Sequence, residues 1–222
     1  MNHNTMDKES LDKLLSDKDD VRTPHLKVKI CVSGAAETSH CGDGSLDMAL
    51  ELGKEIARQG GVIVTGATTG FPLWSAKGAK EEGGFSLGLS PASTEKEHVE
   101  SYGLPLDYMD FIVYTGQGFP GRDILLTRTT DAVILGCGRI GTIHEFAVAF
   151  EDHKPLGILE GPWMTDEVIH MIIDNGFRAN DKVVFEKDPK ILVEKMIAMV
   201  RKEKEEVEVS TLPSSKLDAL AK

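Results

Sequence analysis

The sequence predicts an α/β protein with a three-layer α/β/α fold around a mainly parallel sheet. Short apolar runs alternate along the chain with segments whose apolar residues recur at helical spacing. Glycines closely follow several of these runs, as expected where parallel strands end in tight loops. The chain has 222 residues, a length that favours one core with tails over two full α/β domains.

Seven short apolar runs are predicted as strands. Gly34, Gly66, Gly116 and Gly136 each follow one of these runs within two residues. Because parallel strands end at the same edge of a sheet, we expect these glycines to gather at one edge, where ligands bind in open parallel sheets. In chain order, the predicted strands span 28–32, 62–65, 85–89, 111–114, 132–135, 156–159 and 183–185.

Helices are predicted between the strands from the spacing of apolar residues. In one such segment, Ile143, Phe146, Ala147 and Phe150 fall at positions i, i+3, i+4 and i+7, so they share one face of a helix. The predicted helices span about 46–57, 72–82, 121–129, 141–152, 164–175 and 189–206.

The two ends of the chain are more polar than its middle. Residues 1–24 are predicted as an acidic tail, 25–206 as a single domain and 207–222 as a second tail. The formal net charge of −11 disfavours binding to nucleic acid or to an anionic membrane. Neither a signal peptide nor a membrane span is indicated by the apolar runs. We therefore expect a cytoplasmic protein.

The three cysteines, Cys31, Cys41 and Cys137, are far apart and odd in number. They fit no disulfide framework and no zinc-ligand spacing. Histidine spacing indicates no metal site either, since no two histidines stand three or four residues apart. We expect reduced thiols, no bound metal and no cofactor.

The segment Gly136–Gly141 spells G-x-G-x-x-G, follows a predicted strand and opens a predicted helix. Glu160 lies 19 residues beyond it, close to the place of the acidic ribose ligand in dinucleotide-binding proteins. Only 92 residues run from Asp131 to the end of the chain, too few for two mononucleotide-binding halves. NAD binding is therefore kept as an alternative.

The same segment has the features of an anion site. Gly138 and Gly141 allow a ligand to approach the backbone, and Gly141 and Thr142 lie at a helix N-terminus, where unpaired amides favour an anion. The Thr142 hydroxyl can cap the helix or bind a phosphate oxygen. Glu145 can act as a helix-capping carboxylate, or it can lie beside a phosphosugar and stabilise positive charge at the anomeric carbon.

The stretch GRIGTIHEFAVAF resembles the GG-x-GT-x-x-E signature of the LOG family, labelled "possible lysine decarboxylase", and of its relatives the molybdenum cofactor carrier proteins. KICVSGAAE resembles the family's first strand and Gly-Ser-Ser loop, and the stretch from IVTGATTG to GLSP resembles its second glycine loop, the following helix and the third strand. The resemblance covers residues 28–160 and implies a Rossmann-like fold. The spacing within GAKEEGG fits the cofactor-carrier branch slightly better.

The LOG resemblance implies a homodimer that hydrolyses nucleoside 5′-monophosphates to a free base and ribose 5-phosphate. By motif, its catalytic residues are Arg122, nine residues before Asp131, and Glu145. A carboxylate stabilises the oxocarbenium-like state of N-glycosidic cleavage, and an arginine suits a phosphate or a leaving base. The positions expected to bind the nucleotide or phosphosugar are Gly34, Gly66, Gly70, Gly138, Arg139, Gly141 and Thr142.

The chain departs from the LOG pattern in two loops. Arg139 replaces a glycine, and its side chain can turn outward, narrow the pocket or bind an additional phosphate. Ala35 and Ala36 replace two serines whose hydroxyls could bind phosphate. Two functions follow: a phosphoribohydrolase, or a non-catalytic protein that binds a nucleotide or carries the molybdenum cofactor. Neither function requires a metal ion or a resident cofactor.

Overall fold

The structure, a computed structural model, describes residues 27–211, with side chains up to residue 205. Residues 28–200 form one compact unit, and the other described residues, Lys27 and 201–211, belong to a second unit. The predicted tail 1–24 and most of the predicted tail 207–222 lie outside the described residues, so the domain bounds stay a prediction. Within the described part, no helix is long and apolar enough to cross a membrane.

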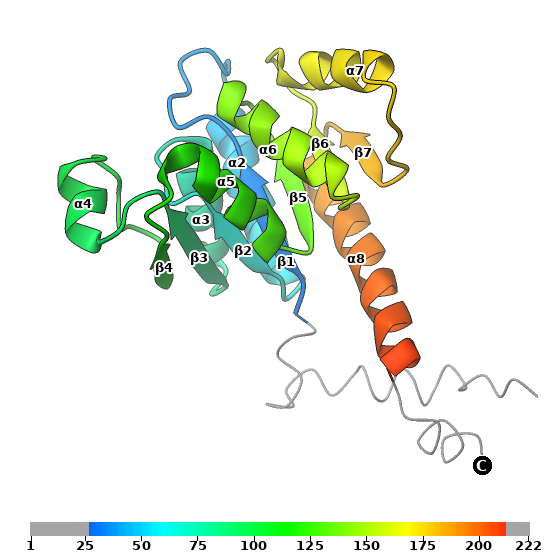
Figure 1. The fold of residues 1–222 in the computed structure, drawn as a ribbon, viewed down its shortest axis with the longest axis horizontal. Coiled ribbons are helices and arrows are strands. Elements are labelled where there is room, and N and C mark those ends of the chain that lie inside the picture. Colours follow the sequence, from blue (N-terminus) through cyan, green and yellow to red (C-terminus); the bar gives the residue numbers. More distant parts are fainter. Residues whose placement is uncertain (1–26, 212–222) are drawn as a thin grey trace, which may run out of the picture. The chain divides into compact units, whose positions relative to one another are not determined.

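All seven predicted strands are present and form a single sheet (Figure 1). They are β1 (Lys29–Ser33), β2 (Val62–Thr65), β3 (Phe85–Ser90), β4 (Phe111–Tyr114), β5 (Ala132–Leu135), β6 (Leu156–Leu159) and β7 (Val183–Glu186). Their order is β4-β3-β2-β1-β5-β6-β7, and every neighbouring pair is parallel. The chain moves outward from β1 to β4 on one side and from β5 to β7 on the other. The pair β1 and β5 is therefore the topological switch point of the sheet.

Helices cover both faces of this sheet. They are α2 (Ser45–Arg58), α3 (Phe71–Glu81), α4 (Glu95–Glu100), α5 (Gly118–Thr129), α6 (Ile140–Glu151), α7 (Thr165–Asn175) and α8 (Pro189–Thr211). One core layer joins α2, α3 and the first part of α8 to the sheet, and the other joins α5, α6 and α7 to its opposite face. This arrangement confirms the predicted three-layer fold. The short helix α4 was not predicted from the sequence.

The helices α2 and α3 pack against each other through two glycines. A Cβ atom on Gly53 would lie 1.8 Å from the Ser75 carbonyl oxygen, and one on Gly78 would lie 2.0 Å from the Leu50 carbonyl oxygen. The backbones can approach this closely only because neither position carries a side chain. Glycine is therefore required inside both helices for their contact.

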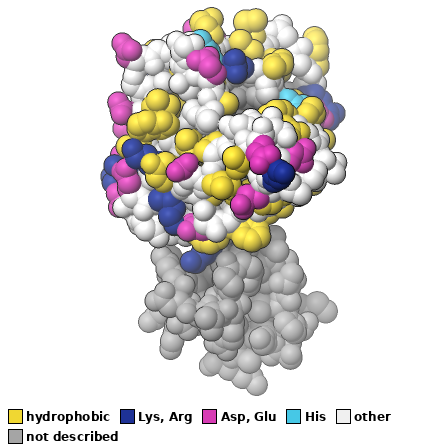
Figure 2. Space-filling view, turned by 90° about the vertical axis from the view of Figure 1, so that its left-hand side faces the viewer, with side chains coloured by type: hydrophobic (Ala, Val, Ile, Leu, Met, Phe, Trp, Pro, Cys, Tyr) yellow, Lys and Arg dark blue, Asp and Glu magenta, His cyan; other side chains and the backbone are white. Residues whose placement is uncertain are grey.

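The outer strand β4 leaves large apolar side chains in solvent. Phe111 and Val113 alternate along β4 and are exposed, as are Phe85 on β3 and Phe119 on α5. Figure 2 views the molecule from the side that carries α4 and β4 in Figure 1, and hydrophobic side chains lie there among charged ones. The predicted homodimer stays a prediction.

The expectation that no cysteines pair is wrong, because Cys41 and Cys137 form a disulfide with a Cα–Cα distance of 5.6 Å. They are 96 residues apart, but each lies in a loop that follows β1 or β5, and these two strands are neighbours. The third cysteine, Cys31, is a buried thiol on β1, and burial raises its pKa. The fold brings together residues whose sequence spacing gave no sign of a pair.

Candidate functional site

The loops that follow β1, β2 and β5 meet at the switch point of the sheet. The Ala35 amide donates to the Cys137 carbonyl oxygen at 2.7 Å, and the Phe71 amide donates to the Ala35 carbonyl oxygen at 2.9 Å. The Gly136 amide donates to the Ser33 carbonyl oxygen at 3.0 Å. The predicted glycines therefore lie along one edge of the sheet, the carboxyl edge, as the strand pattern indicated.

Most of the glycines predicted to bind a ligand are packed closely against other residues of the protein. A Cβ atom on Gly34 would lie 2.7 Å from Phe71, and one on Gly138 would lie 2.3 Å from Thr142. At Gly66 the nearest atom would be Arg122 Nη1, at 1.6 Å. Gly70 is also closely packed, because it has a positive φ of 68° and a Cβ there would face the Ala35 and Ala36 carbonyl oxygens. Gly141 is different, since nothing lies within 4 Å of a Cβ at that position. Among the five, only Gly141 has open space before it.

The two predicted catalytic residues come together below this edge. Arg122 on α5 and Glu145 on α6 have side chains only 6% and 8% exposed, and Arg122 Nη1 lies 3.9 Å from Glu145 Oε1. The Ser33 hydroxyl donates to Glu145 Oε2. Asp123 places its Oδ1 3.4 Å from Arg122 Nε and its Oδ2 3.0 Å from His144 Nδ1. The cluster thus joins β1, α5 and α6 beneath the glycine loops.

The buried cluster changes the acidity of its central carboxyl. Burial raises the pKa of Glu145 to about 7, the Arg122 charge opposes this rise, and the Asp123 charge adds to it. Arg122 Nε makes no hydrogen bond within the described residues. Near neutral pH, the Glu145 carboxyl is therefore divided between its protonated and ionised forms.

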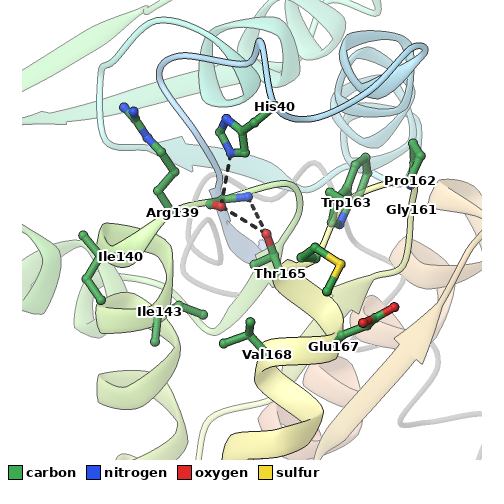
Figure 3. Close-up of a pocket in the computed structure, with 12 residues that line it drawn as sticks. His40, Arg139, Ile140, Ile143, Gly161, Pro162, Trp163, Thr165, Glu167 and Val168 are labelled. Atoms are coloured by element: carbon green, nitrogen blue, oxygen red, sulfur yellow. Dashed lines mark hydrogen bonds between the residues drawn. The ribbon is translucent and has the colours of Figure 1, made fainter.

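A pocket of about 600 Å³ opens on the other side of the glycine loop. Its walls come from the loop after β1, the loop after β5 with the start of α6, and the loop after β6 with the start of α7 (Figure 3). Thr165 fixes the loop, because its Oγ1 accepts from the Gly138 amide at 2.8 Å and lies 3.1 Å from the Gly138 carbonyl oxygen. The lining residues are His40, Gly138, Arg139, Ile140, Ile143, Gly161, Pro162, Trp163, Met164, Thr165, Glu167 and Val168.

The pocket combines apolar walls with one exposed cation. Figure 3 shows Ile140 and Ile143 on one side and Trp163 and Val168 on the other. The Trp163 indole N–H is buried and makes no hydrogen bond within the described residues. Arg139 is exposed, lines the pocket and forms no ion pair with another described residue. A ligand here would meet the exposed apolar side chains of Ile140, Met164 and Val168 and one arginine.

Sequence reasoning located only part of this pocket. Gly138 and Arg139 line it, whereas Thr142 is buried behind Gly138 and the pair of Arg122 and Glu145 is not part of its lining. The segment Gly161–Val168 and His40 were missed. The available signal was the loop that follows β6, because loops at the carboxyl ends of parallel strands often carry binding residues.

The sheet order and the switch-point site define a Rossmann-like α/β protein, a class in which ligands generally bind where the strand order reverses. The sequence profile of the SLOG cluster4 family matches residues 27–193. The chain therefore belongs to the SLOG cluster4 family, which agrees with the resemblance to LOG and molybdenum cofactor carrier proteins.

Several known proteins, among them the following three, are similar to this chain. An uncharacterized protein of Archaeoglobus fulgidus is 31% identical over 135 residues, which are 61% of this chain and 82% of that protein. The molybdenum cofactor binding protein of Rippkaea orientalis has 27% identity and a TM-score of 0.62, over 80% of this chain and 97% of that one. The molybdenum cofactor carrier protein of Chlamydomonas reinhardtii has 28% identity and a TM-score of 0.60, over 79% and 98% of the chains.

Proposed function

We propose that this protein binds a phosphorylated small molecule with a flat ring, a nucleotide or a pterin of the molybdenum cofactor type, and acts as a carrier or sensor of it. The observation that carries the proposal is the pocket at the switch point, which meets the first turn of α6 and the Arg139 side chain. Its volume of about 600 Å³ lies within the range of small-molecule sites. The predictions that the protein is cytoplasmic and binds no nucleic acid remain part of this proposal.

The phosphate is expected at the N-terminus of α6. The first-turn amides of Ile140, Gly141 and Thr142 belong to the donors that a helix leaves unpaired, and the helix dipole adds positive potential there. Gly141 leaves the space before them open. Arg139, directly before the helix, supplies a guanidinium that suits a phosphate oxygen pair.

The ring is expected between the apolar walls. Ile140, Met164 and Val168 present exposed apolar side chains to the pocket. Trp163 is only 5% exposed and contributes a small part of its ring, because it packs against Phe71 in the core. The two molybdenum cofactor proteins at 27% and 28% identity match this chain over nearly their whole length, which supports a cargo of that kind. A chain with net charge −11 must bind a phosphate through such local groups, because its overall field repels anions.

Hydrolysis of nucleoside 5′-monophosphates is the second candidate. It is favoured by the pair of Arg122 and Glu145, 3.9 Å apart, and by the Glu145 pKa of about 7. Binding is the better-supported function because both side chains are at least nine-tenths buried and lie outside the pocket lining. Hydrolysis would require an opening of the glycine loops that exposes this pair.

Two measurements on the full chain test these functions. Calorimetric titration with AMP, ADP, GMP, ribose 5-phosphate and isolated molybdenum cofactor is expected to give saturable binding of at least one of them. Arg139→Ala should weaken that binding roughly 10- to 150-fold, because a charge-assisted contact contributes about 1.5–3 kcal/mol. The matched control is Arg128→Ala, which removes an exposed arginine paired with Asp152 and should bind normally.

The second measurement incubates the protein with AMP, CMP, GMP and UMP and assays for free base. Release of base that Glu145→Gln abolishes, with binding retained, would establish the hydrolase. Binding without release supports the carrier or sensor. If no compound binds and no base appears, both functions are wrong.

A further inference from the structure

A cluster of two sulfurs and one imidazole lies at the rim of the pocket. His40 Nε2 is 3.6 Å from Cys137 Sγ and 3.9 Å from Cys41 Sγ. The cysteines are fully buried, whereas the His40 side chain is 39% exposed. No other group of three or more histidine, cysteine or acidic side chains with metal-binding geometry was found within residues 27–205.

We propose that His40, Cys41 and Cys137 form a zinc site when the disulfide is reduced, so that the bridge and the metal exclude each other. A tetrahedral Zn²⁺ ion with Zn–S distances of about 2.3 Å and a Zn–N distance of about 2.0 Å separates its sulfur and nitrogen ligands by about 3.5 Å. The two observed nitrogen–sulfur distances, 3.6 and 3.9 Å, are close to that separation. Only the two sulfurs must move apart, to about 3.8 Å, which side-chain rotation supplies.

The reaction balances with a dithiol as reductant. The dithiol transfers two electrons and two protons to the Cys41–Cys137 bridge, which becomes two thiols, while the reductant becomes a disulfide. Zn²⁺ then displaces both thiol protons to solvent, and the two thiolates and the neutral His40 imidazole hold the ion. A set of two thiolates and one imidazole binds Zn²⁺ in preference to harder cations such as Mg²⁺ and Ca²⁺.

The site would have one open position. Three protein ligands leave the fourth tetrahedral position for water or for a donor atom of a molecule in the pocket, which His40 also lines. His40 Nε2 lies 3.4 Å from the Gly138 carbonyl oxygen, so turning the ring toward a metal acts on the glycine loop (Figure 3). The redox state of the Cys41–Cys137 bridge therefore determines whether the pocket rim presents a zinc ion with an open position or a disulfide.

The test uses the full chain reduced with dithiothreitol, desalted without oxygen and titrated with Zn²⁺ against a chromophoric chelator. We expect one tightly bound Zn²⁺ per chain in the reduced protein and none in the oxidised protein. Co²⁺ in place of Zn²⁺ should give a thiolate-to-cobalt charge-transfer band in the near ultraviolet and the visible bands of tetrahedral cobalt. Absence of both the stoichiometric binding and the cobalt bands overturns the proposal.

Variants assign the ligands. Cys137→Ser and Cys41→Ser should each abolish the thiolate band of the intact site and stoichiometric binding, and His40→Gln should weaken zinc binding at least about 10- to 100-fold. Cys31→Ala is the matched control, because it removes the one thiol outside the cluster, and it should bind Zn²⁺ normally. His40 is partly exposed, so His40→Gln keeps the test decisive if a serine variant fails to fold. Unchanged zinc binding in His40→Gln and Cys137→Ser would refute the site.

Discussion

Replacing Glu145 by glutamine should remove a loss of folding stability that occurs in the wild type as the pH rises. The pKa of Glu145 is 4.5 in the unfolded chain and about 7 in the folded protein, mainly because burial disfavours the ionised carboxylate. Stability from the protonated carboxyl is fully present below pH 4.5 and is lost as the pH rises through about 7. The loss amounts to about 3 kcal/mol in the free energy of unfolding.

The assay is urea denaturation of the wild type and Glu145→Gln at several pH values. Glutamine keeps an acceptor for the Ser33 hydroxyl but does not titrate, so the difference between the two proteins isolates residue 145. The variant should gain about 3 kcal/mol relative to the wild type between pH 4.5 and a pH above 7, on top of any constant offset. A difference that does not change with pH would refute the description of this cluster.

A control variant has the opposite sign. Lys54 donates to Glu81 and holds the pKa of that exposed carboxyl below its usual value. Its stabilising effect is therefore present above the unfolded pKa of 4.5 and is lost as the pH falls. Glu81→Gln should lose stability relative to the wild type as the pH rises, which distinguishes burial of Glu145 from a general effect of removing a carboxylate.

Three further predictions concern packing, the α6 terminus and assembly. Gly53→Ala should lower the free energy of unfolding by at least about 1–3 kcal/mol in urea titrations, because its methyl group would lie 1.8 Å from the Ser75 carbonyl oxygen. Gly141→Ala should leave stability unchanged or raise it by up to about 1 kcal/mol, because a Cβ there meets no other part of the protein within 4 Å. It should weaken calorimetric phosphate binding, because the added methyl group lies on the helix turn where the phosphate is expected. Light scattering should find a dimer, and Phe111→Asp should shift it toward the monomer; a wild type that is monomeric at micromolar concentration would contradict this prediction.

The sequence predicted the sheet well because burial on both faces gives the central strands β5 and β6 short, almost wholly apolar runs. The strands at 62–65, 111–114, 132–135 and 156–159 begin and end where they were expected. The helix α4 was missed because six residues are too few for an apolar period. Its start was nevertheless visible as the capping-box sequence Thr94-x-x-Glu97. In the structure, Thr94 accepts from the Glu97 amide, and Glu97 accepts from the amide of Ser93, directly before the cap.

The residues of the candidate site that lie within a short sequence motif could be predicted from the sequence. The resemblance to the LOG motifs implied Arg122 and Glu145 as partners, and the structure places Arg122 Nη1 3.9 Å from Glu145 Oε1, while their catalytic role stays a prediction. The bridge between Cys41 and Cys137 and the pocket wall at Gly161–Val168 depend on which strands are neighbours, and that order is not encoded in any short window. The burial of Arg122 likewise depends on its packing over Gly66, a contact between helix α5 and the loop that follows β2.

The most direct test of the proposed binding site is amide chemical-shift mapping of the ¹⁵N-labelled full chain with the nucleotide or cofactor that binds best. A ligand whose phosphate meets α6 and whose ring lies between the apolar walls should move the amide signals of residues 138–143 and 161–168. The amides of residues 95–100 on α4, which contribute no residue to the pocket lining, should not move. Shifts centred on α4 and β4, with residues 138–143 unchanged, would contradict the account.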